Sequence, residues 1–220
     1  MKKVFSVCLA LLFTVFSAVS VCAYEFNGDS LFSMDMPKEF KQDKTDDGYS
    51  FSSENGETLS VEYVDNEDVE DVFSVKDMTK ADIKKYTDKL ASSVKEALAL
   101  YEISAETEII SAKRQKLESG DEALVIQLKT TAVSESKTQT YYQKLYEFGG
   151  INNKFTFTFT TESSERANSF DDAFSTIDIH EAQLRSDKGD LTAYAVVGVI
   201  TALIVVGIIK FIKTPTNKIK

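Results

Sequence analysis

The stretch that decides the fold is Lys154-Phe-Thr-Phe-Thr-Phe-Thr-Thr161. Its phenylalanines alternate with threonines, and successive side chains of a β-strand point to opposite faces of the sheet. One face of this strand is therefore predicted to pack against a core, while the other is predicted to be more polar. It is the clearest strand signal in the chain.

Other strands are predicted on both sides of this one. Asn55-Gly56 lies between the alternating runs 49–51 and 59–63, which is a strong signal for a hairpin. The remaining strands are expected at residues 32–36, 108–116, 122–133 and 138–148.

Two helices are expected to cover the sheet. Thr79 and Asp82 have the spacing of a capping box, which begins a helix of about 22 residues. Its apolar stripe is Ile83, Tyr86, Leu90, Val94, Ala97, Leu98 and Tyr101. A second helix begins at Ser163 or Ser164, with the stripe Ala167, Phe170, Ala173, Phe174 and Ile177. The predicted class is α+β, with a mostly antiparallel sheet of about six or seven strands and two covering helices.

The N-terminus has the three parts of a secretory signal peptide. Lys2 and Lys3 precede an apolar run, and small residues follow it. We place cleavage between Ala23 and Tyr24, so that residues 1–23 are removed. A lipoprotein signal ending at Cys22 is the alternative.

A second apolar run, residues 191–209, contains no charge and predicts one transmembrane helix. It would span about 28 Å, close to the thickness of a bilayer core. Lysines in the tail 210–220 place that tail in the cytoplasm, and therefore place residues 24–179 and the polar stalk 180–190 outside. A buried core helix is the alternative for this run.

Small residues share one face of the predicted transmembrane helix. They are Ala195, Gly198 and Ala202, and Gly198 and Ala202 form a small-xxx-small pair. Such pairs let two helices approach closely, so this face is the candidate surface for a homodimer.

Charge and cysteine content exclude several classes of function. Residues 24–190 hold 19 basic and 35 acidic residues, a net charge of −16. Nucleic acid and anionic lipid surfaces both require a basic surface, so neither is expected as a partner of this part. Cys8 and Cys22 both lie in the signal region, which leaves the exported domain without a thiol or a disulfide.

The order of these elements resembles the PsbP-like superfamily, including its exported bacterial members. The matching stretches are Phe32-Ser-Met-Asp-Met-Pro-Lys-Glu-Phe40 and Phe157-Thr-Phe-Thr-Thr-Glu-Ser-Ser164, followed by Phe170 and Phe174. The resemblance covers about residues 24–179 and implies a helix–sheet–helix sandwich, which is often an accessory or partner-binding domain. It implies no active site, and Phe40 stands where the superfamily has a tryptophan-type aromatic residue.

Four groups of residues are candidate sites, and each also has a simpler structural explanation. Residues 43–54 match an EF-hand loop at Asp43, Asp47, Gly48 and Glu54, but have Thr45 at the third position and strand-like flanks. The acidic run 65–71 is typical of a solvated loop.

His180 is the single histidine, with no cysteine beside it, and is expected to complement the dipole at the end of the last helix. Tyr141, Tyr142, Tyr146 and Phe148 are expected to fill the core or its rim rather than form an aromatic binding surface.

We therefore assign no catalytic, cofactor-binding or metal-ligating residue. The leading hypothesis is a non-enzymatic accessory or binding domain of the bacterial cell envelope, anchored in the cell membrane by one helix and standing beside a protein partner. The alternatives are an envelope hydrolase that uses carboxylates and a carrier that holds a small ligand between sheet and helix.

Overall fold

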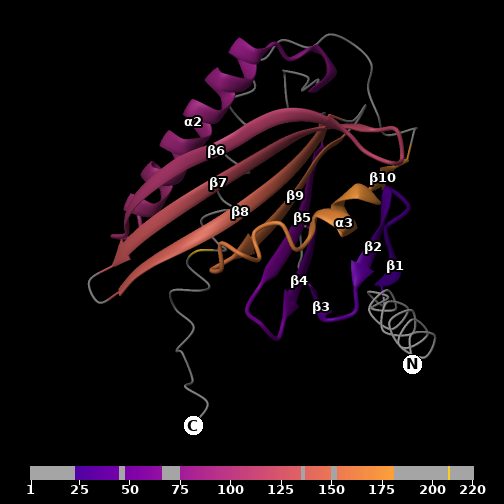
Figure 1. Ribbon diagram of the computed structural model, residues 1–220, viewed down its shortest axis with the longest axis horizontal. Helices are drawn as coiled ribbons and strands as arrows, with labels where there is room; N and C mark the ends of the chain where they lie inside the picture. Colours follow the sequence, from indigo (N-terminus) through magenta and orange to yellow (C-terminus); the bar gives the residue numbers. More distant parts are fainter. Residues whose placement is uncertain are drawn as a thin grey trace, which may run out of the picture.

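The computed structural model describes residues 23–44, 48–65, 75–134, 137–149, 153–180 and 208. They form two antiparallel sheets with one main helix (Figure 1). The large sheet has seven strands in the order β3 (Phe40–Lys44), β4 (Tyr49–Ser53), β5 (Thr58–Asp65), β9 (Asn153–Thr161), β8 (Lys137–Gly149), β7 (Glu122–Ser134) and β6 (Ser104–Lys116). The small sheet has the order β1 (Ala23–Gly28), β2 (Phe32–Pro37) and β10 (Asp178–Ile179).

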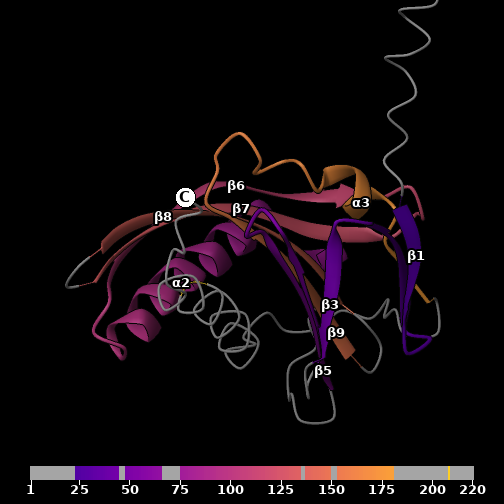
Figure 2. The same ribbon diagram turned by 90° about the horizontal axis from the view of Figure 1, so that it is seen from below.

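The large sheet is covered on both faces. Helix α2 (Lys80–Ala99), preceded by the short 3-10 helix η2 (Val75–Asp77), lies under β6, β7 and β8. The short helix α3 (Asp171–Ser175) lies on the opposite face (Figure 2). Two separate apolar clusters result, one between α2 and the sheet and one between the sheet, α3 and the small sheet.

Strand β9 lies in the middle of the large sheet, between β5 and β8. Phe155, Phe157 and Phe159 are fully buried on the α3 side, which confirms the packed face predicted from the alternation. The threonine face is also buried, which the sequence did not predict. A strand in the middle of a sheet covered on both faces has no solvent side, so its hydroxyls can find partners only inside the protein. Thr160 accepts from the Gln143 side-chain amide at 3.2 Å, whereas the buried Thr158 hydroxyl has no partner among the described residues.

Helix α2 begins as predicted. The Asp82 backbone N–H donates to the Thr79 hydroxyl at 3.2 Å, and the Thr79 backbone N–H donates to the Asp82 carboxylate at 2.9 Å. The buried stripe is confirmed from Ile83 to Leu98. It ends there, because Tyr101 lies beyond the helix and is 56% exposed, so its place in the stripe was wrong.

The predicted second helix is mostly a series of turns. Arg166, Ser169 and Asp171 each donate a backbone N–H to the carbonyl three residues earlier, and only the five residues of α3 are helical. Serine and asparagine side chains compete for backbone hydrogen bonds and favour such turns over helix. The predicted apolar stripe is nevertheless buried at Ala167, Phe170, Ala173, Phe174 and Ile177. The last four belong to the apolar cluster on the α3 side of the large sheet.

The small sheet was not predicted. Phe32–Pro37 is a strand as expected, but it pairs with β1 and β10 instead of joining the large sheet. Strands β1 and β3 were missed, although β1 carries an alternating Tyr24 and Phe26. The hairpin of β4 and β5 has the predicted pairing, with Tyr49 opposite Val61 and Phe51 opposite Leu59.

A tight turn at Asp29 and Ser30 joins β1 to β2. Both residues have positive φ angles, 48° and 62°, a region that glycine adopts freely and that L-residues other than asparagine and aspartate rarely adopt. The Ser30→Gly variant should therefore raise the free energy of unfolding by about 1 kcal/mol, as measured by urea denaturation. Ser33→Gly, within β2, is the matched control and should lower it. A Ser30→Gly variant less stable than the parent protein would contradict this account of the turn.

The predicted signal peptide, stalk, membrane span and cytoplasmic tail lie outside the described residues, apart from Ala23, His180 and Ile208. Ala23 opens β1, opposite Pro37. Ile208 is buried in the α2 cluster. Among the residues that the structure describes, no helix is both long enough and apolar enough to cross a bilayer. The face formed by Ala195, Gly198 and Ala202 falls outside them as well.

Candidate functional site

A groove of about 740 Å³ runs between the first half of α2 and the edge strand β6. Its floor is mainly apolar and its rim is charged. The lining residues are Met78, Thr79, Ile83, Thr87, Ile109 and Ala112, together with the charged Lys80, Lys84, Asp88, Lys113, Arg114 and Glu122. We refer to this set of residues as the α2–β6 groove.

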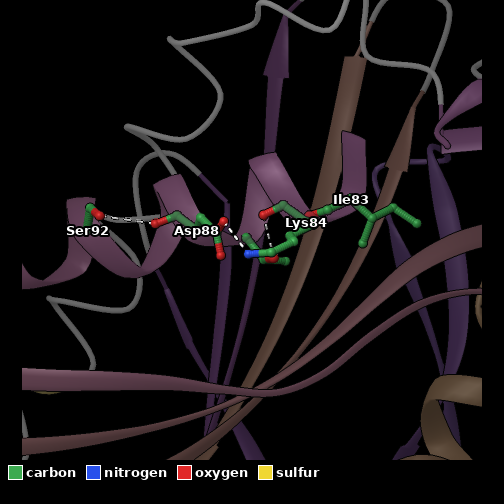
Figure 3. A network of polar contacts seen from close by, with 5 residues as sticks. Ile83, Lys84, Asp88 and Ser92 are labelled. Atoms are coloured by element: carbon green, nitrogen blue, oxygen red, sulfur yellow. Dashed lines mark hydrogen bonds and ion pairs between the residues drawn. The ribbon is translucent and has the colours of Figure 1, made fainter. Parts of the chain in front are cut away.

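The helical wall of the groove is held by short-range contacts along α2. Ile83 is largely buried toward the sheet, and the Thr87 hydroxyl donates to its carbonyl at 3.0 Å. On the outer side, the Lys84 ammonium lies 2.6 Å from the Asp88 carboxylate, and the Ser92 hydroxyl donates to the Asp88 carbonyl at 3.1 Å (Figure 3). The capping hydrogen bonds from Thr79 lower the pKa of the Asp82 carboxyl at the start of this wall.

A β-bulge shapes the opposite wall. The pairing of β6 with β7 shifts between Ile109 and Ser111, so that Ile110 is an extra residue and is 49% exposed. Ile109 and Ala112 are three positions apart and would point to opposite faces of a regular strand. The bulge turns both toward α2, opposite Leu128 and Ile126 of the α2 cluster. The apolar floor of the groove therefore depends on this irregularity.

The rim of the groove is basic, although the chain as a whole carries a net charge of −10. Four lining side chains are cationic and two are anionic. The Lys84 ammonium is paired with Asp88, and the Arg114 guanidinium lies 3.7 Å from the Glu122 carboxylate. Within the described part of the chain, Lys80 and Lys113 have no carboxylate within ion-pair distance. Lys80 stands on the helical wall, whereas Lys113 lies opposite Val125 of the α3-side cluster, so its side chain points to the other face of the sheet.

A second polar cluster is buried further along the underside of α2. The Tyr86 hydroxyl donates to a Glu147 carboxylate oxygen at 2.8 Å, and the Lys154 ammonium lies 3.1 Å from the same oxygen. Lys154 also donates to the Tyr86 hydroxyl at 3.1 Å. Burial lowers the pKa of the Lys154 ammonium, while burial and the nearby carboxylate raise the pKa of the Tyr86 phenol well above its ordinary value. These contacts tie α2 to β8 and β9, and none of the three residues lines the groove.

Two carboxylates are deeply buried, and they lie on different faces of the large sheet. Glu147 is held from the α2 side by Lys154, at 0% exposure of its side chain. Glu57, at 2%, is held by Arg166, which precedes α3; the Arg166 Nε lies 2.6 Å from one carboxylate oxygen. Two acids on different faces of a sheet cannot act on the same bond of a substrate. The pair that an acid–base mechanism requires is therefore not formed by these two residues.

The structure places the candidates from the sequence as follows. Of residues 43–54, the described ones include the end of β3 and all of β4, with Asp43 opposite Ser50, and Glu54 forms an exposed ion pair with Lys41. Of the acidic run 65–71, only Asp65 is described, at the end of β5. In the described ranges, no three acidic, histidine or cysteine residues are grouped so as to hold a metal ion.

The remaining candidates are structural. His180 follows β10 rather than the end of a helix, so its predicted role at a helix dipole was wrong. Its backbone N–H donates to the Leu31 carbonyl at 3.0 Å, and its Nδ1 contacts the Ser30 carbonyl. Tyr141, Tyr146 and Phe148 are buried in the two apolar clusters, as expected, while Tyr142 is half-buried.

Comparison with known proteins gives similarities of fold. No protein-family model matches the chain, and no curated protein matches its sequence. The solution structure of cyanobacterial PsbP (CyanoP) from Synechocystis sp. PCC 6803 matches with 14% identity and a TM-score of 0.48, over 74% of this chain and 96% of that one. A crystal structure from Bacteroides thetaiotaomicron VPI-5482 matches with 14% identity and a TM-score of 0.45, over 71% of this chain and 48% of that one.

The Saccharomyces cerevisiae Ran-binding protein Mog1p also matches, with 10% identity and a TM-score of 0.41, over 84% of this chain and 94% of that one. Cyanobacterial PsbP, a member of the superfamily that the sequence resembles, and Mog1p are thus among the solved structures to which this chain is similar. At these identities the similarity concerns the fold alone, and no activity or partner is transferred from it.

Proposed function

We propose that this protein is a non-enzymatic accessory domain of the cell envelope that binds a partner protein through the α2–β6 groove. The observation that carries the proposal is the basic rim over an apolar floor on an otherwise acidic chain. Charged rims around apolar patches are typical of protein interfaces. In this proposal, residues 1–23 are removed, residues 191–209 anchor the domain in the membrane, and residues 24–190 lie outside.

The two alternatives explain fewer of the observed features. A hydrolase that uses carboxylates would need two acids facing one substrate, whereas the two buried carboxylates lie on different faces of the sheet. A small-ligand carrier could use the groove volume, which lies within the usual range for ligand pockets. It would leave the cations of the rim, Lys80 above all, without a role.

Single cysteines can test both the location and the docking, because the chain has no cysteine outside the proposed signal peptide. We would introduce Lys84→Cys in the groove, Lys95→Cys on α2 outside the groove, and Thr216→Cys in the tail. In intact cells of the native host, a membrane-impermeant maleimide is expected to label the first two and to spare the third until the membrane is opened. Labelling of the tail cysteine alone would overturn the proposed orientation.

The same variants test docking when they are treated with a cysteine-to-amine crosslinker. The groove cysteine is expected to give one discrete adduct with a membrane or envelope protein, while Lys95→Cys, on the same helix, is expected to give none. Equal adducts from both positions, or no adduct from the groove, would contradict a partner bound at this site.

A further inference from the structure

We infer that the α2 side of the large sheet is a docking surface for the C-terminal apolar run of the same chain, residues 191–209. The run then has two alternative places, the bilayer and its own domain. The inference goes beyond the proposed function, because it concerns the anchor and does not depend on a partner in the α2–β6 groove. It starts from Ile208, the residue of this run that the structure describes.

Ile208 packs into the folded domain. It is helical and fully buried, and it belongs to the apolar cluster beneath α2. The other buried members of that cluster all lie between Val75 and Leu145, far from Ile208 in the sequence. A side chain in this position is removed from water without the help of a membrane. The domain therefore offers the end of the run a place that competes with lipid.

The threonine face of β9 also requires a cover that the described helices do not supply. Thr156, Thr158 and Thr160 are each at most 4% exposed. The backbone of α2 nevertheless lies closest to β6, η2 packs against β7 and β8, and α3 lies on the opposite face of the sheet (Figure 2). The segment around Ile208 reaches this side of the sheet and can supply the missing cover.

The side chains of the run suit this surface. In a helix over residues 191–209, Tyr194, Thr201 and Ile208 are seven residues apart and share one face. That face brings an aliphatic side chain to the apolar cluster and two hydroxyl groups to the polar part of the sheet. There the Thr158 hydroxyl and the Gln143 side-chain carbonyl are buried and have no hydrogen-bond partner among the described residues. The two hydroxyls can serve as their donors.

The connecting chain is long enough for the run to fold back. The polar stalk that begins at His180 spans at most about 35 Å when it is extended. A helix from residue 191 to Ile208 adds about 27 Å. Together they exceed the diameter of about 40 Å that is expected for a domain of this size. The run can therefore reach the α2 side from the end of β10.

The bilayer is the stronger of the two competitors for the run. Hydrocarbon surrounds a membrane-spanning helix on all sides, whereas the sheet covers one side of it. Docking on the sheet is therefore expected where no membrane is available, as in water or before insertion. It would hide a large apolar surface that otherwise promotes aggregation. The domain would in this way shelter its own anchor.

The test uses residues 24–220, which contain no cysteine. Ile208→Cys is labelled with a benzophenone maleimide and irradiated in detergent-free buffer, and the crosslinked peptides are identified by mass spectrometry. We expect a monomer with crosslinks inside one chain, to peptides from residues 75–161. In phospholipid vesicles the label is expected to react with lipid, and the crosslink inside the chain should fall by about tenfold.

A cysteine two residues earlier in the run is the matched control. Val206→Cys lies on the opposite side of the same helix, because two residues turn the helix by about 200°. In detergent-free buffer it is expected to give the crosslink inside the chain with a yield at least about fivefold lower than Ile208→Cys. Equal yields from both positions in that buffer would overturn the inference.

A smaller change guards against disturbance by the bulky label. Ile208→Ser is expected to lower the urea midpoint of unfolding by about 1 M in detergent-free buffer, because it places a polar group in the apolar cluster. Val206→Ser should leave that midpoint unchanged. Equal midpoints for Ile208→Ser and the parent would contradict docking.

The outcomes separate the docking from the proposed anchor. If Ile208→Cys reacts with lipid in vesicles but gives no crosslink inside the chain in buffer, the docking fails and the anchor stands. If the crosslink inside the chain persists at equal yield in vesicles, the docking stands and the proposed anchor fails. Aggregation of the parent chain in detergent-free buffer would also overturn the docking, since the sheltered run would then not be hidden.

Discussion

Replacing Lys154 with methionine is expected to lower the free energy of unfolding by about 3–5 kcal/mol, because it leaves the buried carboxylate of Glu147 without its cation. Glu147 is fully buried under α2, and its remaining hydrogen-bond donor in this cluster is the Tyr86 hydroxyl. Urea denaturation at neutral pH measures the loss.

The exposed ion pair of Lys41 with Glu54 supplies a matched control. Its N···O distance is also 3.1 Å, but both side chains are more than 70% exposed. Lys41→Met should therefore lower the free energy of unfolding by less than about 1 kcal/mol. Equal losses in Lys154→Met and Lys41→Met would contradict the account of a buried, tightly coupled pair.

A second substitution tests whether the unpaired charge causes the loss in Lys154→Met. Without its cation, the Glu147 carboxylate is an unpaired buried charge. Adding Glu147→Gln to Lys154→Met removes that charge and should recover part of the loss in the free energy of unfolding at neutral pH.

Raising the pH above 10 is the second change with a large expected effect. Burial raises the pKa values of the Tyr86, Tyr141 and Tyr146 phenols, with nearby carboxylates as the smaller cause. Above about pH 10 the unfolded chain releases these protons and the folded protein retains them. The free energy of unfolding should then fall by about 1.4 kcal/mol per pH unit for each tyrosine, or about 4 kcal/mol per unit for the three.

Lys154 acts in the opposite direction over part of this range. Its lowered pKa means that the folded protein releases this proton before the unfolded chain does, which adds stability as the pH rises toward about 10.5. The net fall should therefore steepen above that pH. Denaturation curves between pH 8 and 11.5, combined with tyrosinate absorbance after a pH jump, measure both effects.

Tyr141→Phe should make the fall in the free energy of unfolding with pH shallower by about 1.4 kcal/mol per pH unit, which is the contribution of one tyrosine. Tyr101→Phe is the control, because Tyr101 is exposed and its loss should leave the slope unchanged. An alkaline transition that is the same in both variants would show that buried phenols do not cause it.

The parts of the fold that were predicted correctly have local signals. The alternation of residues 154–161 fixed a buried strand, and the spacing of Thr79 and Asp82 fixed the start of α2. Both follow from the geometry of one segment, without knowledge of its neighbours.

The errors arose where distant segments decide the structure. The turns around Arg166 bury the same apolar residues that a helix would have buried, so the pattern did not separate the two. Strand β2 has an ordinary strand pattern, and only its pairing with β1 and β10 shows that it belongs to a separate sheet.

The groove could not be found by motif, because its chemistry comes from two segments. Lys80 and Arg114 are ordinary charged residues in the sequence, and they come to line one groove only when α2 packs on β6. The bulge at Ile110 gives Ile109 and Ala112 their common face, and a bulge of one residue has no fixed sequence signal. The contacts among Tyr86, Glu147 and Lys154 likewise depend on how α2 packs against β8 and β9.

The central claim, that the α2–β6 groove docks a partner in the envelope, is tested most directly by the crosslinking yield from Lys84→Cys in three backgrounds. The first is otherwise unchanged, the second carries Lys80→Glu in the groove, and the third carries Lys95→Glu on the same helix outside the groove. The account predicts a discrete adduct in intact cells whose yield falls by about fivefold with Lys80→Glu and is retained with Lys95→Glu. An adduct of equal yield in all three backgrounds would contradict it.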